Sequence, residues 1–302
     1  MSIEVSRISK QYGSQWAVND LSFEIPSGQV VGFLGPNGAG KSTTMKMLTC
    51  YITPTSGTAR VGGLSIETDS LKIRQQIGYL PEHNPLYYDM YVKEYLRFIA
   101  DLCGIRKGTG KRVDHMVELT GLTREASKKI GSLSKGYKQR VGMAQALMSD
   151  PKVLILDEPT SGLDPNQITE IRKLIKEIGQ ERTVLLSTHI MQEVEAMCNR
   201  VIIINKGELA ADDSIGNLQT KHNSQRVFVV KFKNPVNVID LKKVEGIEAL
   251  EDLNDNTFRL VSDKAVDAQE KLFNFAVNSG NIILEQKEEA QNLEHIFRSI
   301  TN

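Results

Sequence analysis

The sequence has few cysteines and no excess of charge of either sign. Cys50, Cys103 and Cys198 lie far apart and form no C-x-x-C pair, which argues against a disulfide framework and indicates free thiols in a reducing compartment. The 37 basic and 37 acidic residues cancel. Domains held to nucleic acid mainly through phosphate contacts are usually strongly basic, so no nucleic-acid partner is expected.

Long hydrophobic runs are also absent. No apolar segment approaches the ~20 residues that span a bilayer. The N-terminus carries Glu4, Arg7 and Lys10 and lacks the continuous apolar stretch of a secretory signal. We therefore expect a cytoplasmic protein that would reach a membrane only through a partner. The 302 residues suffice for one large domain and a small one, or for two medium ones.

What the sequence does contain is a glycine-rich loop between an apolar run and a helical stretch. Val30–Leu34 has the composition of a buried parallel strand, and residues 43–48 are good helix formers. The segment between them fits the pattern G-x-x-x-x-G-K-[ST] of a phosphate-binding loop. Its residues are Gly35, Pro36, Asn37, Gly38, Ala39, Gly40, Lys41, Ser42 and Thr43.

Each part of this loop has a physical role toward phosphate. Glycines let backbone N–H groups approach phosphate oxygens, and the helix that follows adds the positive end of its dipole. Lys41 is expected to reach the β and γ phosphates, and the Ser42 hydroxyl to bind Mg²⁺. By itself the loop indicates a nucleotide phosphate. It does not distinguish ATP from GTP, or a kinase from a motor.

Polar residues follow two of the later apolar runs. Runs at 153–156, 184–186 and 201–204 alternate with helical stretches, which predicts a parallel α/β sheet whose ligand lies beyond the carboxyl ends of the strands. Asp157 and Glu158 follow the first run, and His189 follows the second closely. We expect Asp157 to hold the metal, Glu158 to polarise an attacking water, and His189 to contact the γ-phosphate. A solvated acidic turn is the alternative for the carboxylate pair.

Two further features are ambiguous when taken alone. Ser134 is a good N-cap, so the helix start with Ser134 and Gly136 at its mouth offers a second anion site, although an ordinary capped helix explains it more simply. Tyr12 precedes a glycine near an early edge of the sheet. It either stacks on a nucleotide base or is a half-buried aromatic residue.

Together these residues resemble the nucleotide-binding subunit of an ABC transporter, over about residues 2–218. Residues 35–43 resemble the Walker A motif and 153–157 Walker B, with Glu158 at the catalytic-base position. His189 is similar to the switch histidine, Tyr12 to the adenine-stacking aromatic residue, and residues 161–164 to the D-loop. The signature motif corresponds to Leu133, Ser134, Lys135, Gly136, Tyr137 and Gln139.

The resemblance implies an α/β P-loop NTPase fold with a parallel core sheet, N-terminal antiparallel strands and a helical subdomain at about 90–148. It implies an ATPase that uses ATP and Mg²⁺ and that pairs head to tail as a homodimer, the signature of one subunit facing the Walker A loop of the other. It also implies a transmembrane permease as partner, which would hold the subunit at the inner face of the membrane. The aromatic segment 86–91 is either a packed loop or part of the groove for that permease.

The chain departs from the family pattern at two places. The signature has Lys135 and Tyr137 where the family usually has Gly and Gln, and Glu82 stands where a Gln is expected. Glu82 could still join Ser42 and Asp157 in holding metal. Both departures resemble the exporter branch, and residues 78–87 resemble gliding-motility ATPase subunits.

Beyond Gly216 the composition changes. Residues 219–225 are polar and are expected to form a linker. The region 226–302 reads as strand, weak helix, two strands joined by a turn at 254–256, a helix over 265–278, a strand and a last helix over 293–300. This order is the split βαβ pattern and predicts a small ferredoxin-like α+β domain. Without a catalytic cluster, it is expected to be regulatory or to stabilise a dimer.

Two other function classes remain to be weighed. A soluble ABC-type ATPase acting on ribosomes or DNA usually has two cassettes or a long coiled coil, and this chain has one cassette and no heptad insertion. A P-loop kinase is disfavoured by the signature and by the Asp157–Glu158 pair. Copurification with a permease, or with ribosomes or DNA, would separate the first class from the transporter.

Overall fold

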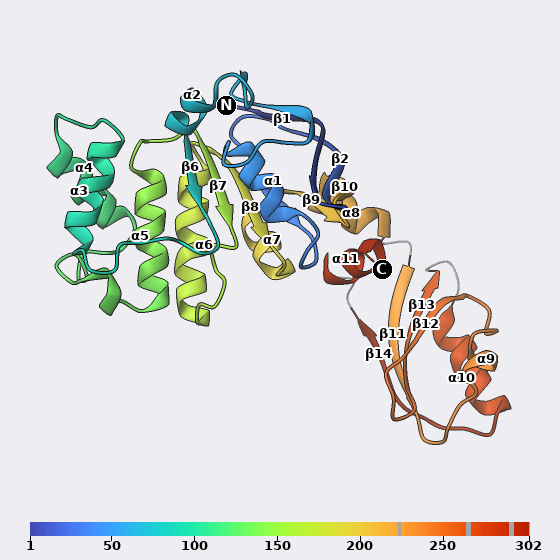
Figure 1. Ribbon diagram of the computed structural model, residues 1–302. Coiled ribbons are helices and arrows are strands. Elements are labelled where there is room, and N and C mark those ends of the chain that lie inside the picture. The colour runs from blue at the N-terminus through green and yellow to red at the C-terminus, as the bar shows by residue number, and fades with distance from the viewer. Residues whose placement is uncertain (223–224, 264–266, 290–292, 302) are drawn as a thin grey trace. The chain divides into compact units, whose positions relative to one another are not determined.

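The computed structural model describes residues 1–222, 225–263, 267–289 and 293–301 (Figure 1). The chain divides into two compact units, Met1–Ser214 together with Thr301, and Ile215–Ile300. Each unit has its own sheets and its own hydrophobic core.

A six-stranded sheet forms the centre of the first unit. In spatial order its strands are β10 (Glu208–Ser214), β9 (Arg200–Asn205), β3 (Val30–Leu34), β8 (Thr183–Thr188), β7 (Val153–Asp157) and β6 (Ile77–Leu80). All neighbours run parallel except β10, which pairs antiparallel with β9. Strands β7 and β8 are buried along their whole length, which explains their continuous apolar runs. The predicted parallel core sheet is confirmed.

The register of these parallel strands brings the segments of interest to one edge of the sheet. Leu34 pairs with Thr188, and Asp157 pairs with Ser187. The loop after β3 and the residues that end β7 and β8 therefore leave the sheet side by side. This edge is where open α/β sheets bind their ligands.

A second, antiparallel sheet comes from the N-terminal part of the chain. In spatial order its strands are β2 (Gln15–Ile25), β1 (Ile3–Tyr12), β4 (Ser56–Val61) and β5 (Leu64–Ser65). Strands β4 and β5 were not predicted from the sequence. Strand β4 escaped notice because it buries only Ala59 and Val61 and contains Gly57. A Cβ on Gly57 would lie 1.9 Å from Arg7 O, so β1 passes too close for any side chain.

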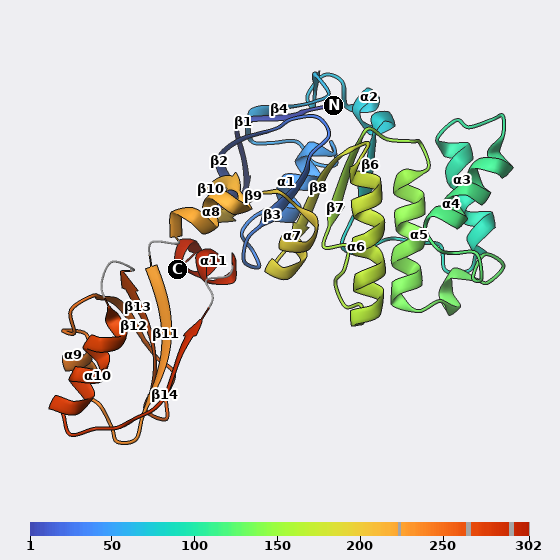
Figure 2. The same cartoon turned by 180° about the vertical axis from the view of Figure 1, so that it is seen from behind.

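The helices of the first unit include a subdomain of three that lies beside β6 (Figures 1 and 2). The subdomain helices are α3 (Val92–Leu102), α4 (Thr109–Leu119) and α5 (Lys135–Leu147), with a 3-10 turn at Ile130–Ser132. The others are α1 (Lys41–Leu48), α2 (Ser70–Gln76), α6 (Pro165–Gly179) and α7 (Met191–Met197). Helix α2 and strand β10 were not predicted, since α2 buries only Ile73 and β10 has no buried residue.

The second unit contains a four-stranded antiparallel sheet with two helices on one of its faces (Figure 1). In spatial order its strands are β12 (Ile247–Asp252), β13 (Thr257–Asp263), β11 (Gln225–Phe232) and β14 (Ile283–Glu289). Its helices are α8 (Ile215–His222), α9 (Val238–Leu241), α10 (Ala268–Asn278) and α11 (Leu293–Thr301). Element order and pairing are those of the split βαβ pattern.

The boundary between the units differs from the one expected. The units divide after Ser214, and α8 runs to His222, so the first part of the expected linker 219–225 is helical. Residues 223–224 of that linker, and 265–266 of the expected helix 265–278, lie outside the described residues. Within the described part of the chain, none of the helices has both the length and the apolar character required to cross a bilayer.

Candidate functional site

The loop between β3 and α1 is shaped by glycines whose positions admit no side chain. Gly40, the N-cap of α1, has a φ of 101°, in the left-handed region. A Cβ on Gly40 would lie 2.4 Å from Ala17 O, and one on Gly35 would lie 2.6 Å from Ile204 O. The first amides of α1 have no partner within the helix, so this end is suited to bind an anion.

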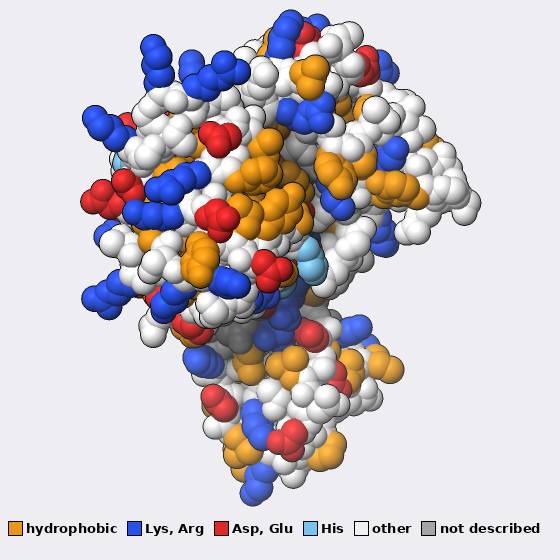
Figure 3. Space-filling model, turned by 60° about the vertical axis from the view of Figure 1, so that its left-hand side comes forward, with side chains coloured by type: hydrophobic (Ala, Val, Ile, Leu, Met, Phe, Trp, Pro, Cys, Tyr) orange, Lys and Arg blue, Asp and Glu red, His pale blue; other side chains and the backbone are white. Residues whose placement is uncertain are grey.

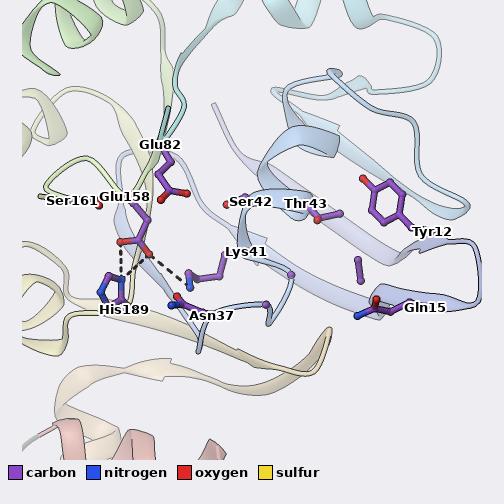
Figure 4. A pocket seen from close by; sticks show the side chains of 13 residues that line it. Tyr12, Gln15, Asn37, Lys41, Ser42, Thr43, Glu82, Glu158, Ser161 and His189 are labelled. Carbon is purple, nitrogen blue, oxygen red and sulfur yellow. Dashed lines mark hydrogen bonds and ion pairs between the residues drawn. The ribbon is translucent and has the colours of Figure 1, made fainter. Parts of the chain in front are cut away.

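Lys41 lies at the centre of the site. Its side chain is 7% exposed, and its ammonium donates to Gly35 O at 2.7 Å and to Pro36 O at 3.3 Å. The same nitrogen lies 3.7 Å from a carboxylate oxygen of Glu158 (Figure 4). A buried ammonium with one carboxylate nearby is well placed to receive further negative charge from phosphate.

Glu158 is held by its neighbours on β8. Its backbone is left-handed, with a φ of 50°, and its N–H contacts both Ser187 O at 3.2 Å and Ser187 Oγ at 3.0 Å. The same hydroxyl donates to Asp157 Oδ1 at 2.6 Å. His189 Nδ1 lies 3.1 and 3.0 Å from the two carboxylate oxygens of Glu158. Residues from β7 and β8 thus form one connected polar group at the sheet edge.

These side chains line a pocket of about 660 Å³ (Figure 4). The sequence-predicted residues that line it are Tyr12, Asn37, Gly38, Gly40, Lys41, Ser42, Thr43, Glu82, Glu158 and His189. Gly35, Pro36 and Ala39 belong to the loop but do not line the pocket, and Asp157 is 2% exposed and likewise absent from the lining. Tyr12 is 52% exposed, and Lys10 Nζ lies 5.4 Å from its ring centroid. The ring is therefore available for stacking on a base.

Gln15 and Ala17 line the pocket and were not predicted from the sequence, and Ser161 also lines it. Gln15 pairs with Tyr12 across the β1–β2 hairpin. The turn at Gly13 next to Tyr12 was the signal that could have identified it. Ser161 comes from the segment likened to the D-loop, whose Asp164 caps α6 by accepting from the Gln167 N–H at 3.0 Å.

The signature residues lie elsewhere in the same chain. Ser134 caps α5, and its Oγ accepts weakly from the Tyr137 N–H at 3.4 Å. A Cβ on Gly162 would lie 2.1 Å from Lys135 Nζ, so the start of α5 packs against the segment 161–164. Leu133 and Gln139 are buried, as is Gly136. None of the signature residues lines the pocket, so the start of α5 and the phosphate-binding loop lie at separate places in one chain.

The residues present fit a bound nucleotide with its metal. The glycine cradle, the start of α1 and the buried Lys41 form a site for phosphates, and the exposed ring of Tyr12 lies at the same pocket. Among the described residues, no group of three or more His, Cys, Asp and Glu side chains could hold a metal alone. Ser42, Glu82 and Asp157 could supply some oxygen ligands to Mg²⁺, which commonly keeps waters and takes phosphates as its other ligands.

The Ser187 hydroxyl links the Asp157 carboxylate to the Glu158 backbone N–H, and its removal is expected to destabilise the first unit. Ser187→Ala leaves the buried Asp157 Oδ1 without its hydrogen-bond donor, which costs about 1–3 kcal/mol. Ser262 is the matched control, because it is also fully buried but its Oγ has no partner among the described residues. Thermal unfolding should show a lower transition for Ser187→Ala and an unchanged one for Ser262→Ala. Equal melting of both variants would contradict the bridging role.

Comparisons with known proteins agree with this geometry. A family profile described as ABC transporter matches residues 18–161. The bacitracin transport ATP-binding protein BcrA of Bacillus licheniformis is 35% identical over 297 residues, covering 98% of this chain and 95% of that protein. The linearmycin resistance ATP-binding protein LnrL of Bacillus subtilis is 31% identical over 305 residues, covering 99% and 98%. A dimeric ATP-binding cassette solved after hydrolysis, with ADP and Pi, superposes with a TM-score of 0.65 at 25% identity, over 70% of this chain and 98% of that one.

The fold and the pocket define an ATPase of the ABC class. The chain belongs to the family of ABC transporter ATP-binding proteins. It binds the adenine nucleotide through the cassette and couples its hydrolysis to transport. The predicted fold class is confirmed, with the parallel core sheet, the N-terminal antiparallel sheet and the C-terminal antiparallel sheet.

Proposed function

We propose that two copies of this chain pair head to tail around two Mg²⁺–ATP and thereby drive a membrane permease that exports its substrate. The separation of the two phosphate-facing elements carries the proposal. The pocket holds Lys41 and Glu158, whereas Ser134 caps a helix outside it. An element suited to phosphate but remote from the pocket of its own chain is useful if it serves the pocket of a second copy. Dimers of related cassettes support this arrangement.

Each residue of the site has a role in this scheme. Lys41 and the loop amides bind and orient the phosphates, and Tyr12 stacks on the adenine. Glu158 accepts the proton of the attacking water, and His189, which contacts Glu158, orients it. The metal, held in part by Ser42 and Asp157, would neutralise charge on the phosphates.

The signature's role can be tested in a chain whose hydrolysis is blocked by Glu158→Gln. Adding Ser134→Arg places a bulky cation at the start of α5, which should prevent ATP-dependent dimerisation. The affinity of the monomer for ATP should stay unchanged, since Ser134 lies outside its own pocket. Sedimentation with and without ATP and a nucleotide titration measure the two effects. Ser132→Arg is the matched control, because Ser132 is likewise an exposed serine but lies just before the signature motif. Dimerisation of the Ser134→Arg chain as strong as that of its parent would refute the head-to-tail arrangement.

The transported substrate is proposed from the relatives of the whole chain. BcrA and LnrL match over nearly their full lengths, which includes the second unit, and their names refer to bacitracin transport and to linearmycin resistance. We propose that this chain also energises efflux of an antibiotic-like compound. The gliding-motility function implied by residues 78–87 has no support from these relatives. A strain that lacks the chain separates the two functions. Greater sensitivity to bacitracin or linearmycin would support efflux, whereas a loss of motility would support the gliding function.

A permease would need a surface on which to dock. Hydrophobic side chains gather on one face of the first unit (Figure 3). Tyr51 and Leu102 are 75% and 69% exposed and line a groove of about 760 Å³ together with residues of β6 and α5. Tyr87 and Tyr88, in the aromatic segment 86–91, are each 54% exposed. The groove, with the exposed side chains of Tyr51 and Leu102 in its lining, suits a helix presented by a membrane protein.

The second unit is proposed to regulate the ATPase or to stabilise its dimer. Its core is built around Phe228, Phe232 and Leu260, and it is a domain of its own rather than an extension of the cassette. The soluble alternative, an ABC-type ATPase acting on ribosomes or DNA, is less favoured because the near-full-length relatives are transport and resistance proteins. The two can be separated by purifying the protein from cells with its bound partners. A copurified permease would support transport, whereas copurified ribosomes or DNA would support the alternative.

A further inference from the structure

A buried carboxylate lies directly behind the switch histidine. Glu193, on α7, has no solvent exposure, and its Oε2 accepts from Thr188 Oγ1 at 2.8 Å. The same hydroxyl accepts from the Ile190 N–H at 3.1 Å. The residues on either side of His189 are therefore both tied, through one hydroxyl, to this carboxylate. None of the three lines the nucleotide pocket.

The charge of Glu193 is poorly compensated for a group at this depth. Arg172 of α6 is the nearby cation, but its Nη2 lies 3.9 Å from Glu193 Oε1. Glu193 Oε1 and Arg172 Nε are buried, and neither has a hydrogen-bond partner among the described residues. Burial first, and the Glu193 carboxylate second, raise the pKa of the Cys198 thiol to about 12. A loosely paired buried carboxylate contributes little to stability, so its presence at this position calls for another explanation.

The connection that carries His189 is short. Strand β8 ends at Thr188 and α7 begins at Met191, so two residues span the gap. The His189 side chain is 48% exposed, and packing therefore does not confine its ring. The backbone is fixed before His189 by the pairing of Thr188 with Leu34, and after it by the Glu193 N–H, which donates to Ile190 O at 3.1 Å. The Thr188 hydroxyl adds the side-chain contacts that join the two sides. His189 Nδ1 lies 3.0 Å from the carboxylate of Glu158.

We propose that Glu193 and Thr188 are a positioning pair for the switch histidine. Glu193 orients the Thr188 hydroxyl, the hydroxyl fixes the Ile190 N–H, and His189 is thereby presented to Glu158. Arg172 extends the contact to α6, the helix that begins at Asp164 just after the pocket residue Ser161. The inference rests on the proposed role of His189 and adds the residues through which that role is controlled.

The test replaces the Thr188 hydroxyl without changing side-chain volume. Thr188→Val should lower the kcat for ATP hydrolysis about 10- to 100-fold, because a small misplacement of a catalytic group has effects of that order. The Kd for ATP should stay within about twofold, since the pocket is intact. Thr188→Ser keeps the hydroxyl and should restore kcat.

Thr183 provides a matched control on the same strand. It is 1% exposed, and its hydroxyl also donates once, to Met1 O, and accepts once, from the Gly28 N–H. Thr183→Val loses the same number of hydrogen bonds at the far end of β8. It should affect thermal stability as Thr188→Val does, with no comparable loss of kcat. An equal loss of kcat in both variants would show that Thr188→Val acts through general destabilisation, and would overturn the proposal.

Two further measurements separate this inference from the proposed function. Glu193→Gln keeps an acceptor for Thr188 and should retain most activity, whereas Glu193→Met removes it and should match Thr188→Val. In a His189→Ala chain, Thr188→Val should lower kcat no further, because both changes act on one group. Full activity of His189→Ala would refute the proposed role of His189. A chain that needs His189 but tolerates Thr188→Val and Glu193→Met would refute the positioning pair alone.

Discussion

Lys41→Ala should raise the Kd for ATP by about 100-fold or more, the largest effect on binding that we expect from a single change. The Lys41 ammonium is buried and is the cation of the phosphate loop that lies within the pocket. Charge-assisted hydrogen bonds contribute about 1.5–3 kcal/mol each, and two phosphate contacts therefore account for a loss of this size. Titration with a fluorescent ATP analogue and isothermal calorimetry measure it.

Lys46 serves as the control for this prediction. It lies on the same helix but does not line the pocket, and Lys46→Ala should bind ATP as the wild type does. The circular dichroism spectra of both variants should match that of the wild type, because Lys41 bonds only loop carbonyls and faces Glu158. ATP binding by Lys41→Ala at wild-type affinity would show that the ammonium is not a phosphate ligand.

Glu158→Gln should lower ATP hydrolysis by about 10²–10⁴-fold while ATP affinity is retained. This range is typical for the loss of a positioned general base. The amide has the shape of the carboxylate and keeps an acceptor oxygen for His189, so the pocket should stay intact. Because the bound ATP is not hydrolysed, the ATP-bound dimer should accumulate. Phosphate release and sedimentation of the ATP-loaded protein measure the two outcomes.

The control for this change is a carboxylate far from the pocket. Glu177 on α6 is 55% exposed, and its carboxylate lies 4.0 Å from the Lys173 ammonium. Glu177→Gln should hydrolyse ATP at the wild-type rate. If Glu158→Gln also did so, Glu158 would not be the base, and the geometry that joins it to Lys41 and His189 would need another explanation.

Much of the site could be predicted from the sequence because its parts are local. The loop 35–43 is continuous, and glycines at fixed spacing followed by Lys41 permit few other structures. The Asp157–Glu158 pair and His189 were predicted from a simple rule, that parallel strands end at the ligand edge. Elements whose local patterns are weak were missed. Strand β4 and helix α2 bury too few residues to show a period.

Contacts between distant segments could not be predicted in this way. Gln15 enters the pocket because a hairpin pairs it with Tyr12. The Ser187 hydroxyl links the Asp157 carboxylate to the Glu158 N–H because β8 lies beside β7 in a particular register. The buried Glu193 looked like any acidic residue early in a helix. Its burial depends on α6 and its Arg172, which the sequence places in another element.

The sequence by itself determined the chemistry of this protein, since a glycine loop with Lys41 and an acidic pair after an apolar run define a phosphate site whatever surrounds them. Tertiary structure alone decided the geometry. Strand register set Glu158 between Lys41 and His189. The packing of α5 placed Ser134 away from its own pocket. Register and packing depend on residues far apart in the chain, so no local pattern could reveal that Ser134 lies outside the pocket of its own chain.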